Sequence, residues 1–181
     1  NPALEAMGIE GRYIRLHILE GDFEEAIRLL PELGFHGTNV TIPHKFNALA
    51  NVDEVGSLAK QLGAVNTVAC ESDGRLLGFN SDGPGFLRSL REAFQVDAGD
   101  LRIMILGAGG GAGRAVAIQC ALEKCERLVL VNRTVEKVQA LAEELRPHFA
   151  SELVAGPVER LECLALDSPD MAHQLDHIDL I

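Results

Sequence analysis

Lys45 and Asp82 are the two residues of this chain whose types and positions most favour chemistry on a carbonyl group. Each follows a short run of β-forming residues, so each is expected at the end of a strand, facing a cleft. Hydride addition to a ketone leaves an alkoxide that needs a proton, and an ammonium beside it can stabilise the charge and transfer a proton. A carboxylate can orient that ammonium and bind substrate hydroxyls. From the residues alone, a surface lysine and a helix-capping aspartate remain alternatives.

A glycine cluster supplies a second chemical signal, from Gly107 to Ala112. It follows the apolar run Arg102 to Leu106 and opens a helical pattern, the context in which a Gly-x-Gly-x-x-Ala sequence indicates dinucleotide binding. Glycines let the backbone approach a pyrophosphate closely, and a helix N-terminus offers free N–H groups. A glycine-rich turn that serves only helix–strand packing is the alternative.

The next predicted strand, Arg127 to Val131, bears on the choice of cofactor. It ends in Asn132, Arg133 and Thr134, and Lys137 follows one turn later. NAD is usually held at such a strand end by an Asp or Glu, and none is present here. Arg133 can pair with a phosphate, and Lys137 adds positive charge. The sequence therefore favours NADP over NAD, with two solvated basic residues as the alternative.

The elements that would position these groups fall into two series. In the first half, the patterns predict a strand over Arg12 to Ile18, a helix from Asp22 and a strand over Thr38 to Ile42, which together would form a parallel βαβ unit. Two short strands around Asp73-Gly74 follow as a hairpin. Pro84 suits a first helical turn, which would make Gly83 the cap and leave Asp82 free.

The second half restarts as strand, glycine loop, helix, strand and helix, the opening of a doubly wound domain. The helix after Thr134 should bury Val138, Leu141, Ala142 and Leu145, and end at Pro147. Beyond it, a short strand is expected at Leu153-Val154 and part of a helix over 158–164. We therefore expect an α/β protein with a small, parallel-rich substrate domain over residues 1–99 and a Rossmann-type dinucleotide-binding domain over 100–181.

Composition restricts the classes of function. The 181 residues carry a net charge of −11, which disfavours nucleic acid and anionic membrane surfaces as partners. No apolar run is long enough to span a bilayer. The four cysteines form no metal-ligand spacing, so we expect no metal, reduced thiols and a cytoplasmic location.

Four motifs in order resemble the shikimate dehydrogenase family. They are Asn-Val-Thr-Ile-Pro-His-Lys at 39–45, Ala-Val-Asn-Thr at 64–67, Asn-Ser-Asp-Gly at 80–83 and the glycine loop. The resemblance implies NADPH-dependent reduction of 3-dehydroshikimate to shikimate, in aromatic amino-acid biosynthesis. It implies a catalytic pair, Lys45 and Asp82, and contacts to a polyol carboxylate substrate from Thr41, Lys45, Asn66 and Asp82. It also implies that NADP contacts Gly107, Ala108, Gly109, Gly110, Gly111, Ala112, Asn132, Arg133, Thr134 and Lys137.

The chain departs from the family pattern in three places. Ser81 replaces the usual threonine and keeps a hydroxyl. The upstream Ser-x-Ser substrate motif is absent, as are the downstream Asn-Ala-Thr strand end and a glutamine-bearing helix, so we expect the protein to be incomplete at both ends. A quinate or dual quinate/shikimate dehydrogenase is one alternative. A non-catalytic dinucleotide sensor is another, although a sensor would not need both Lys45 and Asp82.

Overall fold

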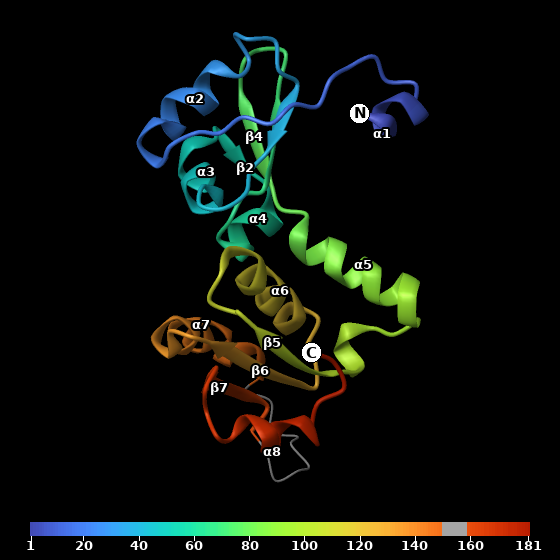
Figure 1. Cartoon of the computed structure of the whole chain (residues 1–181), viewed down its shortest axis with the longest axis vertical. Helices are drawn as coiled ribbons and strands as arrows, with labels where there is room; N and C mark the ends of the chain where they lie inside the picture. The colour runs from blue at the N-terminus through green and yellow to red at the C-terminus, as the bar shows by residue number, and fades with distance from the viewer. Residues whose placement is uncertain (150–158) are drawn as a thin grey trace.

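The computed structural model describes residues 1–149 and 159–181 and places them in two parts along its long axis (Figure 1). The helices are α1 (Pro2–Ala6), α2 (Phe23–Leu29), α3 (Lys45–Asn51), α4 (Ser57–Leu62), α5 (Asp82–Phe94), α6 (Gly111–Leu122), α7 (Val135–Phe149) and α8 (Met171–Leu175), with short 3-10 turns η1 (Glu20–Asp22) and η2 (Ala98–Asp100). The strands are β1 (Gly37–Asn39), β2 (Glu54–Val55), β3 (Thr67–Cys70), β4 (Leu76–Phe79), β5 (Arg102–Leu106), β6 (Arg127–Asn132) and β7 (Leu161–Ala165).

The first sheet has the order β1-β3-β4-β2. Its centre is the predicted hairpin, in which Gly74 takes a left-handed conformation (φ 87°) that glycine adopts without strain. β1 pairs antiparallel with β3, and only β2 and β4 are parallel. The α/β class is therefore confirmed, while this sheet is mixed where we expected mostly parallel pairing.

The strand predicted over Arg12 to Ile18 does not form, and the prediction was wrong. The segment is extended and mostly exposed, and none of its backbone groups joins a described strand. Side chains hold its two ends: the hydroxyl of Tyr13 donates to Asn39 Oδ1 at 3.0 Å, and His44 Nε2 lies 2.9 Å from the carbonyl oxygen of Ile18. Alternation of apolar residues indicates a preference for extended backbone, but a strand also needs a hydrogen-bonded neighbour.

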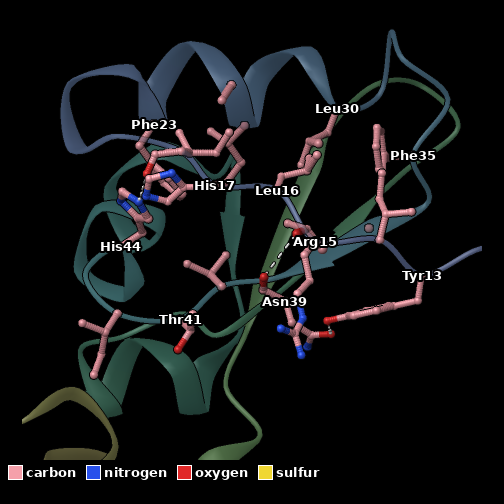
Figure 2. Close-up of a pocket in the computed structure, with 18 of the residues that line it drawn as sticks. Tyr13, Arg15, Leu16, His17, Phe23, Leu30, Phe35, Asn39, Thr41 and His44 are labelled. Atoms are coloured by element: carbon pink, nitrogen blue, oxygen red, sulfur yellow. Dashed lines mark hydrogen bonds between the residues drawn. The ribbon is translucent and has the colours of Figure 1, made fainter. Parts of the chain in front are cut away.

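A cavity of about 820 Å³ lies between this extended segment, α2 and β1 (Figure 2). Its lining is largely apolar and includes Phe23, Leu30 and Phe35. Ile14 and Leu16, which a paired strand would have helped to cover, are each 53% exposed. The first part of the chain therefore carries an open apolar groove beside β1.

The second sheet follows the predicted doubly wound pattern. β5, β6 and β7 pair in parallel in that order, and Leu180 adds a single parallel bridge to Ile103 on the outer edge of β5. Within the stretch expected to be part of a helix, residues 161–164 instead belong to β7, because their backbone pairs in parallel with the edge of β6. The strand expected at Leu153-Val154 lies outside the described residues. Pro147 lies inside α7, so it does not end that helix as predicted.

Two main hydrophobic clusters support the two sheets. The predicted face of α7, with Val138, Leu141 and Leu145, is buried under β6 and β7. Leu87 and Leu90 of α5 join this same cluster, since α5 packs along α6. The helix that follows the first sheet in sequence is therefore packed, along its length, against the second part of the chain.

Asp179 anchors the last described residues to β5, and its titration gives a stability prediction. Its carboxylate accepts hydrogen bonds from the backbone N–H of Arg102 at 2.9 Å and from Nη2 of the same arginine at 2.6 Å. These bonds lower the pKa of Asp179 from 3.8 to about 2. Because the folded pKa is below the unfolded one, the stabilisation is complete above about pH 4 and is lost as the pH falls toward 2.

We expect Asp179→Asn to lower the free energy of unfolding at neutral pH by about 1 kcal/mol, since solvent screens a pair that is one-third exposed. The deficit should shrink as the pH falls below about 4. Urea titrations across this range measure it. Asp176→Asn is the control, because Asp176 forms no ion pair with a described residue, and a pH-independent deficit would contradict the assignment.

Three further features of the described residues bear on function: the reactivity of their thiols, their potential metal ligands and the length of their helices. All four cysteines are free, and burial raises the pKa of both Cys120 and Cys125 to about 12, so these two thiols are unreactive at neutral pH. No group of His, Cys, Asp and Glu in the described ranges could hold a metal ion. Among the same residues, no helix has the length and apolar character needed to cross a membrane.

Candidate active site

The structure brings Lys45 and Asp82 into direct contact. Lys45 Nζ donates to Asp82 Oδ2 at 2.6 Å, and the two side chains are 11% and 23% exposed. Lys45 is the first residue of α3. It does not directly follow a strand, because β1 ends earlier than predicted, at Asn39. Asp82 is the first residue of α5. Partial burial strengthens the charge–charge interaction, and both side chains keep some exposure to solvent.

The cap of α5 differs from the sequence prediction. The N-cap residue is Ser81 rather than the expected Gly83, so α5 begins at Asp82, earlier in the sequence than predicted. The carboxylate of Asp82 does not cap the helix: Oδ2 accepts from Lys45 and Oδ1 from Asn66. The capping role considered for Asp82 is therefore wrong, and its charge lies in the first helical turn, where the helix dipole stabilises it.

Asn66 connects the two strands of the hairpin to the pair. Its Nδ2 donates to Asp82 Oδ1 at 2.7 Å and to Ser81 Oγ at 3.2 Å, which uses both amide hydrogens. Its Oδ1 accepts from the backbone N–H of Ser81 at 3.0 Å and from the hydroxyl of Thr67 at 2.9 Å. Asn66 is 7% exposed. Its side chain therefore fixes the carboxylate of Asp82 from the side opposite Lys45.

His44 stabilises the turn that precedes Lys45. The His44 ring stacks on Phe23, the first residue of α2, with centroids 4.5 Å apart and planes 11° apart. Figure 2 shows the two rings side by side at one end of the groove. The backbone N–H of His44 donates to the carbonyl of Thr41 at 2.8 Å. Thr41, an expected substrate contact, lies exposed on this turn and lines the groove.

The glycine loop combines a left-handed glycine with a helix N-terminus that no side chain caps. Gly107 has a φ of +86°, and α6 begins at Gly111 after the N-cap Gly110, which has no side chain to cap the helix. An ideal Cβ at Gly113 would lie 2.4 Å from the carbonyl oxygen of Gly107. Gly113 is therefore the glycine that allows helix and loop to pack. Sequence reasoning placed this position at Ala112, which is exposed, and the next glycine in the cluster was the available signal.

The end of β6 lies against this loop. An ideal Cβ at Gly109 would be 2.8 Å from Asn132 Nδ2 and 3.0 Å from Lys137 Cβ, so only glycine fits there. Asn132 Nδ2 donates to the carbonyl of Thr134 at 2.9 Å, which shapes the turn into α7. Arg133 and Lys137 are exposed, and neither forms an ion pair with a described residue. Lys137 thus lies beside the glycine loop, and the second exposed cation, Arg133, directly follows the end of β6.

The two halves of the site meet at the start of α6. An ideal Cβ at Gly111 would lie 3.5 Å from Lys45 Cδ, which is ordinary van der Waals contact. On the other side of the pair, an ideal Cβ at Gly83 would lie 2.8 Å from Gln119 Oε1 of α6. The lysine–aspartate pair is therefore adjacent to the helix N-terminus that the glycine loop opens.

This arrangement, with a glycine loop on a parallel sheet next to a lysine–aspartate pair beside a mixed sheet, defines a two-part α/β protein whose second part has the architecture of a doubly wound nucleotide-binding domain. Residues 1–68 match the family model of the shikimate dehydrogenase substrate binding domain, and residues 89–164 match that of shikimate / quinate 5-dehydrogenase. The chain belongs to the shikimate dehydrogenase family.

Individual relatives agree with this placement. A shikimate dehydrogenase (NADP(+)) from Rhodospirillum rubrum is 48% identical over 140 residues, which are 76% of this chain and 49% of the relative. One from Methanopyrus kandleri is 38% identical over 181 residues, or 100% and 59%. The crystal structure of shikimate 5-dehydrogenase from Thermus thermophilus in complex with NADP(H) and shikimate aligns with a TM-score of 0.71 at 40% identity, covering 80% of this chain and 53% of the other. The chain thus spans about half the length of the relatives it matches.

Proposed function

We propose that the protein to which this chain belongs is an NADP-dependent shikimate dehydrogenase, which reversibly reduces 3-dehydroshikimate to shikimate. One observation carries the proposal: the Lys45–Asp82 ion pair, at 2.6 Å, lies in contact distance of the helix that the glycine loop opens. A ketone bound at the pair would lie beside the cofactor. The relatives named above support the same reaction.

We assign the proton chemistry to Lys45 and its orientation to Asp82. The ammonium of Lys45 stabilises negative charge on the substrate oxygen and donates the proton when the ketone is reduced. Asp82 holds the ammonium in place and accepts hydrogen bonds from substrate hydroxyls. Thr41 and Asn66 complete the substrate side. Because both amide hydrogens of Asn66 are already donated, a substrate hydroxyl would replace Ser81 Oγ, the longer of its two partners.

The chain's residues fit NADP. The first turn of α6 offers backbone N–H groups, and Gly107, Ala108, Gly109, Gly110, Gly111 and Ala112 present backbone without bulky side chains, which suits a pyrophosphate. Asn132, Arg133, Thr134 and Lys137 lie at the strand end where the adenosine ribose belongs. When bound, the cofactor supplies the hydride. The residues of this chain orient the cofactor. None of Asn132, Arg133, Thr134 and Lys137 carries a carboxylate that would repel its 2′-phosphate.

Quinate dehydrogenase activity is the second candidate, because the model that matches residues 89–164 covers shikimate and quinate enzymes together. Quinate carries one ring hydroxyl more, so the two differ in a single polar contact. Steady-state assays of the full-length protein with shikimate and quinate, each with NADP and NAD, decide between them. Turnover of neither substrate would contradict both assignments and favour a dinucleotide sensor.

The proposal also covers the domain division, the partners and the location of the protein. We propose a division into a substrate domain over residues 1–99 and a dinucleotide-binding domain over 100–181, and a small polyol carboxylate, rather than nucleic acid or a membrane, as the partner. A cytoplasmic location is supported by four free thiols.

Arg133 provides a test of cofactor choice. A charge-assisted hydrogen bond to a phosphate contributes roughly 1.5–3 kcal/mol, and 1.4 kcal/mol is a factor of about ten. We expect NADPH to bind about tenfold or more tightly than NADH. Arg133→Ala should weaken NADPH more than NADH, measured by calorimetric titration of both cofactors. Arg146→Ala, at the far end of α7, is the charge-matched control. An equal loss for the two cofactors would leave Arg133 as a residue that stacks on adenine or contacts solvent.

A further inference from the structure

We propose that Asn80 is a positioning residue that sets the separation of Lys45 and Asp82. Asn80 directly follows β4 and is 7% exposed. Its Nδ2 donates to the carbonyl of Ala64 at 2.9 Å, and its Oδ1 accepts from the backbone N–H of Asp82 at 2.9 Å. The orientation of the amide is unambiguous, because one partner can only accept and the other can only donate.

The partner segment of Asn80 also holds Lys45. The backbone N–H of Val65 donates to the carbonyl of Lys45 at 3.0 Å, and Ala64 and Val65 are both completely buried. Residues 64–65 therefore connect to Lys45 on one side and, through Asn80, to Asp82 on the other. The Asn80 amide and the backbone of residues 64–65 together link the first residue of α5 to the first residue of α3.

At neutral pH an amide can make both bonds and a carboxylate cannot. Alanine would leave the Ala64 carbonyl and the Asp82 N–H without partners in a buried site, while aspartate would keep the acceptor and turn a second acceptor toward the Ala64 carbonyl. A protonated carboxyl would restore the donor. Since a displacement of about 1 Å can cost on the order of 10²-fold in rate, loosening this connection should act on turnover through the pair.

The kinetic test rests on the proposed function and uses Asn80→Ala and Asn80→Asp in the full-length protein. We expect kcat for shikimate oxidation to fall by about tenfold or more in both, with the Kd of NADPH within about twofold of wild type. Asn80→Asp should regain activity as the pH is lowered through the titration of the new carboxyl, and Asn80→Ala should not. Loss of packing alone would give no such pH-dependent rescue.

Asn51→Ala is the matched control. Asn51 lies at the far end of α3, and its Nδ2 donates to the carbonyl of Asn47 at 2.9 Å, so its removal also deletes one amide-to-carbonyl bond but no contact with the pair. We expect its kcat to match that of wild type. A fall equal to that of Asn80→Ala would overturn the proposal, as would a loss that disappears when activity is normalised to folded protein.

A second readout is independent of turnover. The Lys45 side chain is 11% exposed and its Nζ is held by Asp82, which protects the amine from an amine-reactive reagent. Labelling of Lys45, followed by mass spectrometry, should be faster in Asn80→Ala than in wild type or Asn51→Ala. Unchanged labelling together with unchanged kcat overturns the role of Asn80. If wild type turns over neither shikimate nor quinate, the proposed function fails, and the labelling rates alone still decide the role of Asn80.

Discussion

Replacing Lys45 by alanine in the full-length protein should lower kcat by about 10²–10⁴, the usual cost of losing a positioned proton-transfer group. The variant removes an ammonium that lies 2.6 Å from Asp82 and is nearly buried between α3 and α5. The Kd of NADPH should stay within about threefold, because only the aliphatic part of Lys45 approaches the glycine loop. Steady-state kinetics and cofactor titration measure the two quantities separately.

Lys60→Ala is the control for this variant. Lys60 is an exposed lysine on α4 and forms no ion pair with a described residue, so its removal should leave kcat unchanged. A change in kcat of less than about threefold for Lys45→Ala would show that the lysine does not act in proton transfer. A large increase in the Kd of NADPH would instead place Lys45 in cofactor binding.

Asp82→Asn should reduce kcat by about 10²-fold or more and weaken substrate binding at the same time. Both carboxylate oxygens of Asp82 accept from donors, Oδ2 from Lys45 and Oδ1 from Asn66. An asparagine has one oxygen and one NH₂ group, so it must turn a donor toward one of these two donors. The pair loses its charge attraction, and either Lys45 or Asn66 loses a partner.

The stability of Asp82→Asn separates chemistry from structure. An unsatisfied buried donor costs roughly 1–3 kcal/mol, so a modest fall in Tm is expected beside the kinetic defect. Asp97→Asn is the control, because it removes an aspartate whose ion pair with Arg91 is more than half exposed. If Tm falls and the kinetics of the folded protein are unchanged, Asp82 has a structural role only.

The contact between Lys45 and Asp82 was more predictable from the sequence than the scaffold that carries it. Lys45 and Asp82 were expected at strand ends facing a cleft; the structure places each at the start of a helix and brings the two side chains to 2.6 Å. β5 and β6 were predicted to within one residue, because a parallel strand buried on both faces is a continuous apolar run. The helix that starts at the glycine loop was also predicted, because its signal, a glycine cluster directly after an apolar strand, lies in adjacent residues.

The errors concern features that depend on partners elsewhere in the chain. Residues 12–18 have the alternation of a strand but pair with none of the described strands, and residues 161–164, expected to be helical, instead pair with the open edge of β6. Gly113 could not be distinguished from its neighbours, since the contact with Gly107 that requires a glycine exists only in three dimensions. Asn80 and its bridge to Ala64 had no sequence signal beyond the motif around Asp82.

The packing of α5 has a consequence for how such enzymes can recombine. Its body, through Leu87 and Leu90, belongs to the core under the second sheet, while its first residue, Asp82, pairs with Lys45 of the first part. If residues from about 99 onward were exchanged with those of a relative, the incoming part would pack against an α5 from a different parent. An exchange upstream of α5 would bring a foreign aspartate to the native lysine. The first crossover would divide the core under the second sheet, and the second would pair a lysine and an aspartate from different parents, so exchange at either point separates residues that contact each other in this chain.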